Sequence, residues 1–178
     1  DGTVEMMSAN GIDCWHGLGN VVKGKVKRDK VLQVAGLDWT VSKQPLLRRN
    51  SRGQLVEVES VVGIVRDDND KELGVAGLDY GVVQNEVLAD WTDLLVGSGA
   101  SYETAGALRD GRQVWFLLNL EDATEITIEG DKFKRYLIAV TSHDRSMALT
   151  LRFVNIRVVC ANTLSWGLRE AKAAIRLN

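Results

Sequence analysis

The side chains best suited to metal binding or covalent chemistry are the two cysteines and the two histidines of the chain. Cys14 and His16 are separated by a single residue, whereas His143 and Cys160 lie far downstream. A structural zinc site is tetrahedral and usually takes paired ligands that have two to four residues between them. The spacing therefore disfavours zinc, and we expect neither a metal nor a nucleotide cofactor.

A nucleophilic site made of Cys160, His143 and Asp144 is the enzymatic alternative. Cys160 lies in the segment VVCANT, between a predicted strand and a predicted helix, where a cysteine is more often a small buried hydrophobic residue. His143 and Asp144 are adjacent in a predicted turn, where aspartate commonly accepts hydrogen bonds from local amides. The GLG motif at 17–19 lacks the strand and helix of a phosphate-binding loop. We therefore expect a protein that is not an enzyme.

Basic residues gather at predicted turns, although the chain as a whole has a net charge of −2. The residues expected to contact phosphates are Arg48, Arg49, Arg52, Arg109, Arg112, Lys132, Lys134 and Arg135. Solvated arginine and lysine side chains on turns are suited to the backbone of a nucleic acid. The simpler alternative is that these charges only solvate the turns.

Length and composition favour one domain. The 178 residues, 45% of them hydrophobic, are enough for a core without disulfides, and residues 1–29 look irregular and glycine-rich. No run is long enough to span a bilayer, so we expect no membrane partner. We expect the chain to be the ordered core of a longer cytoplasmic protein.

Strand periodicity dominates the first half of the chain. It predicts strands at 39–47, at 55–66 and at 72–77, with charged turns between them. Pro45 lies inside the first of these strands, which suits an edge or a bend. A short helix at 30–36 is expected to begin after Asp29 and to stop at Gly36.

A second helix is predicted after Gly81. Its expected buried face consists of Val83, Val87, Leu88, Trp91, Leu94 and Leu95. These positions follow the period of an amphipathic helix, so the sequence predicts that they pack on the core.

A hairpin and a buried strand are predicted next. Residues 101–108 and 114–120 flank a turn with an Asp-Gly pair, which favours a tight hairpin, and 124–128 reads as a short strand. Residues 133–141 are apolar enough for a central strand covered on both faces. Trp115 lies opposite the other apolar residues of its strand, so it either meets a second layer or offers an exposed surface.

The segment from 147 to 176 predicts a strand followed directly by a helix. The apolar positions alternate up to Phe153 and then change phase, which predicts a bulge near Phe153–Val154. The predicted helix has one apolar and one basic side. Its apolar residues are Leu164, Leu168, Ala171 and Ile175, and its basic residues are Arg169, Lys172 and Arg176. The whole pattern predicts an α+β fold, an antiparallel sheet of hairpins with amphipathic helices packed on one face.

A series of motifs resembles the phage/plasmid-like protein family, a domain of unknown function found in prophages, phages and conjugative plasmids. The motifs are WHGLG at 15–19, AGLDW at 35–39, the run 73–85, YETAGALRDGRQVW at 102–115, SHD at 142–144 and RVVCANTL at 157–164. The resemblance covers nearly the whole chain and implies a role in DNA metabolism. The strand–turn–strand–helix order is also similar in outline to Rad52-like single-strand annealing proteins.

These observations lead to the hypothesis of a homo-oligomeric DNA-binding protein of a mobile element. Single-stranded DNA is the expected partner, in the cytoplasm of a bacterial host, and annealing during recombination is the expected role. The second hypothesis is a module that captures a host protein, motivated by the acidic pI and by an exposed Trp115.

Overall fold

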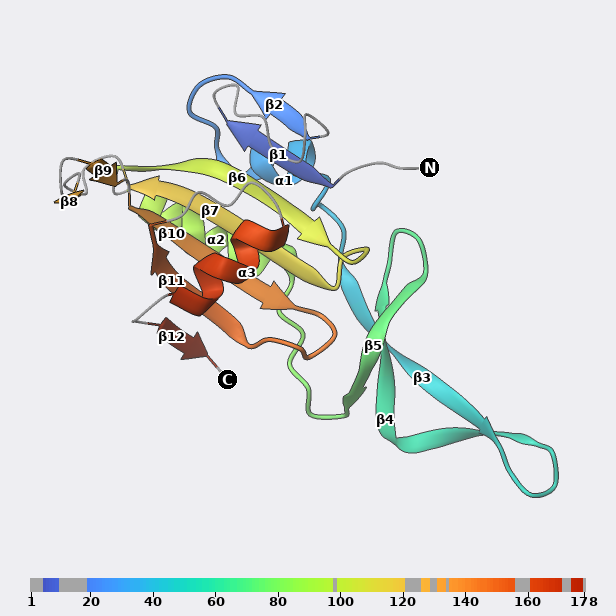
Figure 1. Ribbon diagram of the computed structural model, residues 1–178. Helices are drawn as coiled ribbons and strands as arrows, with labels where there is room; N and C mark the ends of the chain where they lie inside the picture. The colour runs from blue at the N-terminus through green and yellow to red at the C-terminus, as the bar shows by residue number, and fades with distance from the viewer. Residues whose placement is uncertain are drawn as a thin grey trace.

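The fold is α+β, as the sequence predicts, with a large sheet, a smaller protruding sheet and helices (Figure 1). The computed structural model describes residues 5–9, 19–97, 99–120, 126–128, 131–133, 135–155, 161–170 and 174–177. The helices among them are α1 (Arg28–Ala35), α2 (Asn85–Val96) and α3 (Ala161–Glu170). None of the helices in this part of the chain is long and apolar enough to cross a membrane.

The large sheet has the strand order β12-β11-β10-β7-β6-β1-β2 and is antiparallel except between β1 and β2. In chain order its strands are β1 (Met6–Ala9), β2 (Asn20–Val22), β6 (Ala100–Leu108), β7 (Gln113–Leu120), β10 (Tyr136–Ser142), β11 (Leu149–Val154) and β12 (Ala174–Leu177). β8 (Ile126–Ile128) and β9 (Asp131–Phe133) form a separate pair. β10 lies in the interior of the sheet and is buried along its whole length, which confirms the predicted central strand.

Helices cover both faces of the large sheet, which corrects the prediction that they pack on one face. Val114, Phe116 and Leu118 of β7 point into the core shared with α1 and α2. Trp115 and Leu117 point into a second core, to which α3 contributes Leu164. Because both sets of alternating side chains on β7 are apolar, each face needs its own cover.

The first residues are more regular than predicted. β1 is completely buried and pairs with β6, and β2 pairs with β1. The expectation of an irregular segment over 1–29 is therefore wrong for these two strands. Both are too short to show a clear period in the sequence.

α1 confirms its prediction closely. It ends at Gly36, whose φ of 65° is left-handed, and its N-cap is Lys27, with Asp29 inside the first turn. Glycine is favoured at such a C-terminal position because it has no Cβ to clash.

α2 is confirmed as a helix, but its buried face differs from the predicted one. Asn85, Leu88, Ala89 and Thr92 are buried, whereas Val87, Trp91 and Leu94 are exposed. Two small or polar residues lie on the buried face because Asn85 and Thr92 hydrogen-bond to groups inside the core. Leu88 was predicted correctly, and Val83 and Leu95 pack partly buried against the core, so hydrophobic periodicity was wrong for Val87, Trp91 and Leu94.

The end of the chain also differs from its prediction. α3 stops at Glu170, and β12 follows and pairs antiparallel with β11, so the predicted helix through Ile175 and Arg176 is wrong.

β11 pairs regularly with β10 through Val154, without the predicted bulge. Phe153 is 59% exposed, and the helix that contacts β11 is α3, on the other face of the sheet.

The smaller sheet, with the order β3-β4-β5, forms an arm that projects from the body (Figure 1). Its strands are β3 (Val41–Arg49), β4 (Leu55–Arg66) and β5 (Lys71–Gly77). Pro45 lies in the edge strand β3 and beside a register shift, as predicted, since proline cannot donate to a neighbouring strand.

Candidate nucleic-acid interface

The outer part of the arm is a two-stranded ribbon. β5 pairs with β4 only between Val61 and Arg66, whereas 47–49 pair with 55–57 and have no third strand beside them. We call residues 46–58 the distal ribbon. An isolated two-stranded hairpin is only marginally stable in water, so a partner that contacts the distal ribbon would stabilise it.

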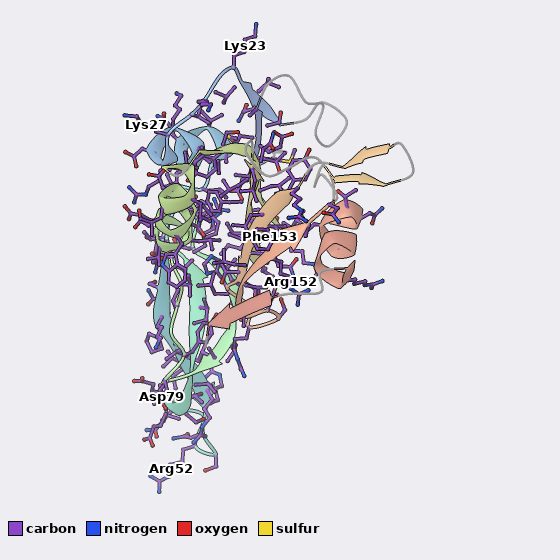
Figure 2. The ribbon with its side chains drawn as sticks, turned by 90° about the vertical axis from the view of Figure 1, so that its left-hand side faces the viewer. Lys23, Lys27, Arg52, Asp79, Arg152 and Phe153 are labelled. Atoms are coloured by element: carbon purple, nitrogen blue, oxygen red, sulfur yellow. The ribbon has the colours of Figure 1, made fainter. Side chains whose placement is uncertain are left out.

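Asn50 organises the turn at the end of the distal ribbon. Its Oδ1 accepts hydrogen bonds from the amides of Arg52 (2.9 Å) and Gln54 (3.0 Å). Its backbone carbonyl accepts from Gly53, whose φ of 75° closes the turn. These local bonds, of the kind that Asn favours in turns, hold Arg52 at the outermost end of the molecule (Figure 2).

The distal ribbon carries an excess of positive charge. Residues 46–56 contain Arg48, Arg49 and Arg52 and no carboxylate, and all three side chains are exposed. Arg48 and Arg49 lie in β3 rather than in the predicted turn. No ion pair involves these arginines within the described part of the chain, and Arg49 donates instead to the carbonyl of Gly53 at 2.9 Å. We call the three arginines the basic tip.

Arg109 and Arg112 lie at the base of the arm, in the turn between β6 and β7. Arg109 and Asp110 have positive φ values of 53° and 61°. The left-handed backbone of this turn therefore begins at Arg109, one residue before the Asp-Gly pair of the predicted turn. Lys71 forms an ion pair with Asp110 at 2.8 Å, and this hydrogen bond lowers the pKa of the Asp110 carboxyl. Charge at the base of the arm is therefore partly compensated.

The described members of the third group of predicted cations, Lys132 and Arg135, lie away from the arm. Lys132 belongs to β9, and Arg135 immediately precedes β10, at the end of the sheet away from the arm (Figure 1). Lys134 lies outside the described residues. Of the eight predicted cations, the structure gathers Arg48, Arg49 and Arg52 at one place and separates them from this group.

A buried polar cluster joins the arm to the body. Arg66 at the end of β4 is buried, forms ion pairs with Asp68 (2.6 Å) and Glu5, and stacks 4.2 Å from the centre of the Trp39 ring. Burial opposes the charge of Arg66, but the hydrogen bonds that the guanidinium donates to Asp68 and Glu5 outweigh it and raise the pKa of the guanidinium. Gly111 packs against the same indole ring. This cluster fixes the inner end of the arm.

His143 belongs to the same cluster and is 1% exposed. Its Nε2 is 3.0 Å from Oδ1 of Asn85, and its ring meets Trp39 edge-on at 5.4 Å. The pKa of His143 is lowered to about 4, mainly by burial; nearby Asp144 opposes this shift, and Arg66 contributes to it. The ring is therefore neutral at pH 7 and packs α2 against the end of β10.

Of the three residues proposed for the enzymatic alternative, the structure describes His143 and Asp144. The Asp144 carboxylate accepts from the amide of Ser146 at 2.9 Å, which is the predicted turn geometry. Cys14, His16 and Cys160 lie outside the described residues. Among the residues that are described, no three histidines, cysteines or carboxylates are grouped as a metal site requires.

Trp115 is completely buried beneath α3. Of the two alternatives for Trp115, burial against a second layer is confirmed, and exposure, which motivated the host-protein hypothesis, is wrong. Among the described residues, the exposed aromatic side chains are Trp91 on α2, 38% accessible, and Phe153 on β11, 59% accessible.

The sequence predicted the strands and the charged turn of this hairpin, but it did not predict that their outer part, the distal ribbon, extends beyond the third strand of the arm. Pro45 marked the edge strand at its inner end.

Comparison with known proteins identifies a family that the chain matches, but it does not identify an activity. The family model described as "Domain of unknown function (DUF932)" matches residues 72–178. No curated protein and no solved structure matches the chain.

Proposed function

The chain belongs to the DUF932 family, a domain of unknown function, and from this premise we propose that it is a non-enzymatic, oligomeric protein that binds single-stranded DNA through the basic tip. Binding at this place uses arginine–phosphate contacts and needs no nucleotide or metal.

The observation that carries the proposal is the outer part of the ribbon, residues 46–56, which has three arginines and no carboxylate and lies at the end of an arm on a net-negative chain. Arginine binds phosphate with a planar, permanently charged group that can form two hydrogen bonds at once. Because the distal ribbon protrudes, its tip reaches a polyanion before the acidic body does. Release of counterions from the nucleic acid then favours binding.

The other predicted cations have secondary roles in this proposal. Arg109 and Arg112 at the base of the arm extend the contact toward the body. Lys132 and Arg135 would meet a distant part of a long strand, or a strand held by another copy. Many weak phosphate contacts add along one strand when copies assemble on it.

The biological setting comes from the sequence resemblance. Similarity to the phage/plasmid-like family supports a role in the DNA metabolism of mobile elements, in the cytoplasm of a bacterial host. The outline shared with Rad52-like proteins supports single-strand annealing as that role.

The test compares two matched pairs of substitutions. Arg48→Gln/Arg52→Gln removes two charges from the basic tip, and Lys23→Gln/Lys27→Gln removes two charges at the opposite end of the molecule (Figure 2). Binding of a labelled oligothymidine at low salt is measured by fluorescence anisotropy, with a duplex of the same length for comparison.

We expect the tip variant to bind the oligothymidine roughly tenfold more weakly, about 1.4 kcal/mol, and the Lys23/Lys27 variant to bind as the wild type does. Absence of binding by the wild type at low salt, or equal losses in both variants, rejects the proposal. Stronger binding to the duplex rejects the preference for single strands.

A further inference from the structure

α2 exposes an apolar surface in addition to the face that it buries. Val87, Trp91 and Leu94 lie at positions i, i+4 and i+7, so they form a ridge along the helix. Their side chains are 42%, 38% and 77% exposed, respectively. A helix that is apolar on its core side and again on its solvent side has a second surface available for a partner. We call these three residues the α2 ridge.

An acidic cleft lies beside the α2 ridge. It has a volume of about 580 Å³, and its lining includes the carboxylates of Asp29, Asp38 and Glu86 and the ammonium of Lys30. Lys30 donates to the side chain of Gln33. Glu86 of the cleft and Val87 of the ridge lie in the same turn of α2, so one partner can reach both.

Local ion pairing leaves this surface negative. Arg28 contacts Asp29 (2.9 Å), Asp90 (2.6 Å) and Glu86, so a single guanidinium is shared by three carboxylates. The partner that fits the ridge and the cleft therefore presents apolar side chains next to a positive charge.

One face of the distal ribbon has this composition. Residues directly opposite in an antiparallel pair point to the same side, and Arg49 pairs with Leu55 while Leu47 pairs with Glu57. Leu47, Arg49 and Leu55 therefore share a face, together with Glu57. The two leucines are each 59% exposed. Arg48 lies on the opposite face.

The two surfaces are far apart in one molecule. Arg52 marks the outer end of the distal ribbon, and α1 and α2 lie on the body at a distance from it in both views (Figures 1 and 2). A contact between them therefore joins two copies. The ribbon and the helix are different surfaces, so each copy can give one contact and receive another, which builds a ring or a filament.

We propose that the distal ribbon of one copy docks on α2 of a second copy, with Leu47 and Leu55 on the α2 ridge and Arg49 in the acidic cleft. Arg48 remains directed away from this contact because it lies on the opposite face. The interface does not depend on DNA, so it stands or falls separately from the proposed DNA binding.

The first test uses variants that each block one side of the contact. Leu47→Glu/Leu55→Glu alters the distal ribbon and keeps the α2 ridge, whereas Val87→Glu/Leu94→Glu alters the ridge and keeps the ribbon. All four positions are exposed, so the fold is expected to tolerate the changes. Sedimentation velocity is measured without DNA over a concentration series that extends into the millimolar range.

The wild type is expected to form species larger than a dimer as its concentration rises. Each variant alone is expected to remain at the monomer mass of 19.6 kDa. An equimolar mixture of the two is expected to stop at twice that mass, because one complete contact remains and both ends are blocked. A wild type that stays monomeric, variants that assemble alone, or a mixture that stays monomeric overturns the proposal.

The second test compares neighbouring arginines on opposite faces of the distal ribbon. Arg49→Glu is expected to weaken self-association at least tenfold, and Arg48→Glu is expected to leave it within twofold of the wild type. Equal effects of the two substitutions overturn the assignment of Arg49 to the cleft. Oligothymidine binding by Arg48→Glu separates this result from the proposed function, because that variant is expected to lose DNA affinity while it still assembles.

Discussion

The two ends of the arm place arginine residues in opposite environments. At the inner end Arg66 is buried, paired with Glu5 and Asp68, and stacked on Trp39. At the outer end Arg48, Arg49 and Arg52 are exposed and have no carboxylate within 46–56. The same residue type therefore stabilises the fold at one end and remains available to a ligand at the other.

The comparison shows that positive charge alone does not identify a binding surface. Arg66 has both its charge and its hydrogen bonds satisfied inside the protein, so a phosphate would gain little from it. The arginines of the basic tip keep their hydrogen-bonding capacity for a partner, except for the bond from Arg49 to Gly53. Substitutions at the two ends should consequently affect different properties.

The largest effect is expected from Arg66→Met. This change leaves Glu5 and Asp68 without their cation and uncovers the Trp39 ring, so the free energy of unfolding should fall by about 3 kcal/mol. Urea denaturation gives the value. The control Arg52→Met should stay within about 0.5 kcal/mol of the wild type, and a similar loss in both variants would show that the two environments are equivalent.

His143 should make the junction, but not the distal ribbon, sensitive to pH. The pKa of His143 is lowered by burial to about 4 in the folded protein, whereas an unfolded histidine titrates near the usual value of about 6.5. Between these values only the unfolded state takes up the proton, so stability is complete above about pH 6.5 and falls as the pH is lowered toward 4.

The His143 contribution to this fall should be about 3 kcal/mol. His143→Gln removes the titrating group, so its stability should decrease less than that of the wild type over the same pH range in urea denaturation. A difference between the two proteins that is independent of pH would contradict the neutral, buried state of His143.

A pair of glycines gives the smallest and sharpest contrast. Gly111 has a φ of 99°, and a Cβ there would lie 3.0 Å from Cη2 and Cζ2 of Trp39, whereas Gly53 has a φ of 75° with open space around it. Gly53→Ala should cost about 1 kcal/mol from backbone strain alone, and Gly111→Ala about 2 kcal/mol because packing is also disturbed. Thermal unfolding of both variants tests the order, and a larger cost at Gly53 would contradict it.

Local pattern was sufficient for much of the fold. The strand at 55–66 and the central position of 136–142 could be predicted because alternation and continuous apolar runs reflect burial on one or two faces. Gly36 and Pro45 were informative because each restricts the backbone in a specific way.

Tertiary context decided the rest. The buried side of α2 depends on Asn85, which donates to backbone carbonyls of Leu37 and Trp39 nearly fifty residues away, and periodicity carries no trace of such a bond. The end of α3 depends on pairing between β12 and β11. Helical spacing alone extended the helix into that strand.

The candidate site was predictable in composition but not in geometry. The sequence shows Arg48, Arg49 and Arg52 as a cluster, but it does not distinguish them from Arg109, Arg112 and Arg135 as candidates for phosphate contact. Only the three-dimensional arrangement separates the protruding tip from the compensated base of the arm and from the far end of the sheet.

The most direct measurement is the salt dependence of single-stranded DNA binding by the wild type and by Arg48→Gln/Arg52→Gln. Each phosphate contact contributes about 0.7 to the slope of log affinity against log salt concentration for single strands. Loss of two contacts should therefore make the slope shallower by about 1.4. An unchanged slope would contradict the claim that the basic tip binds the DNA backbone.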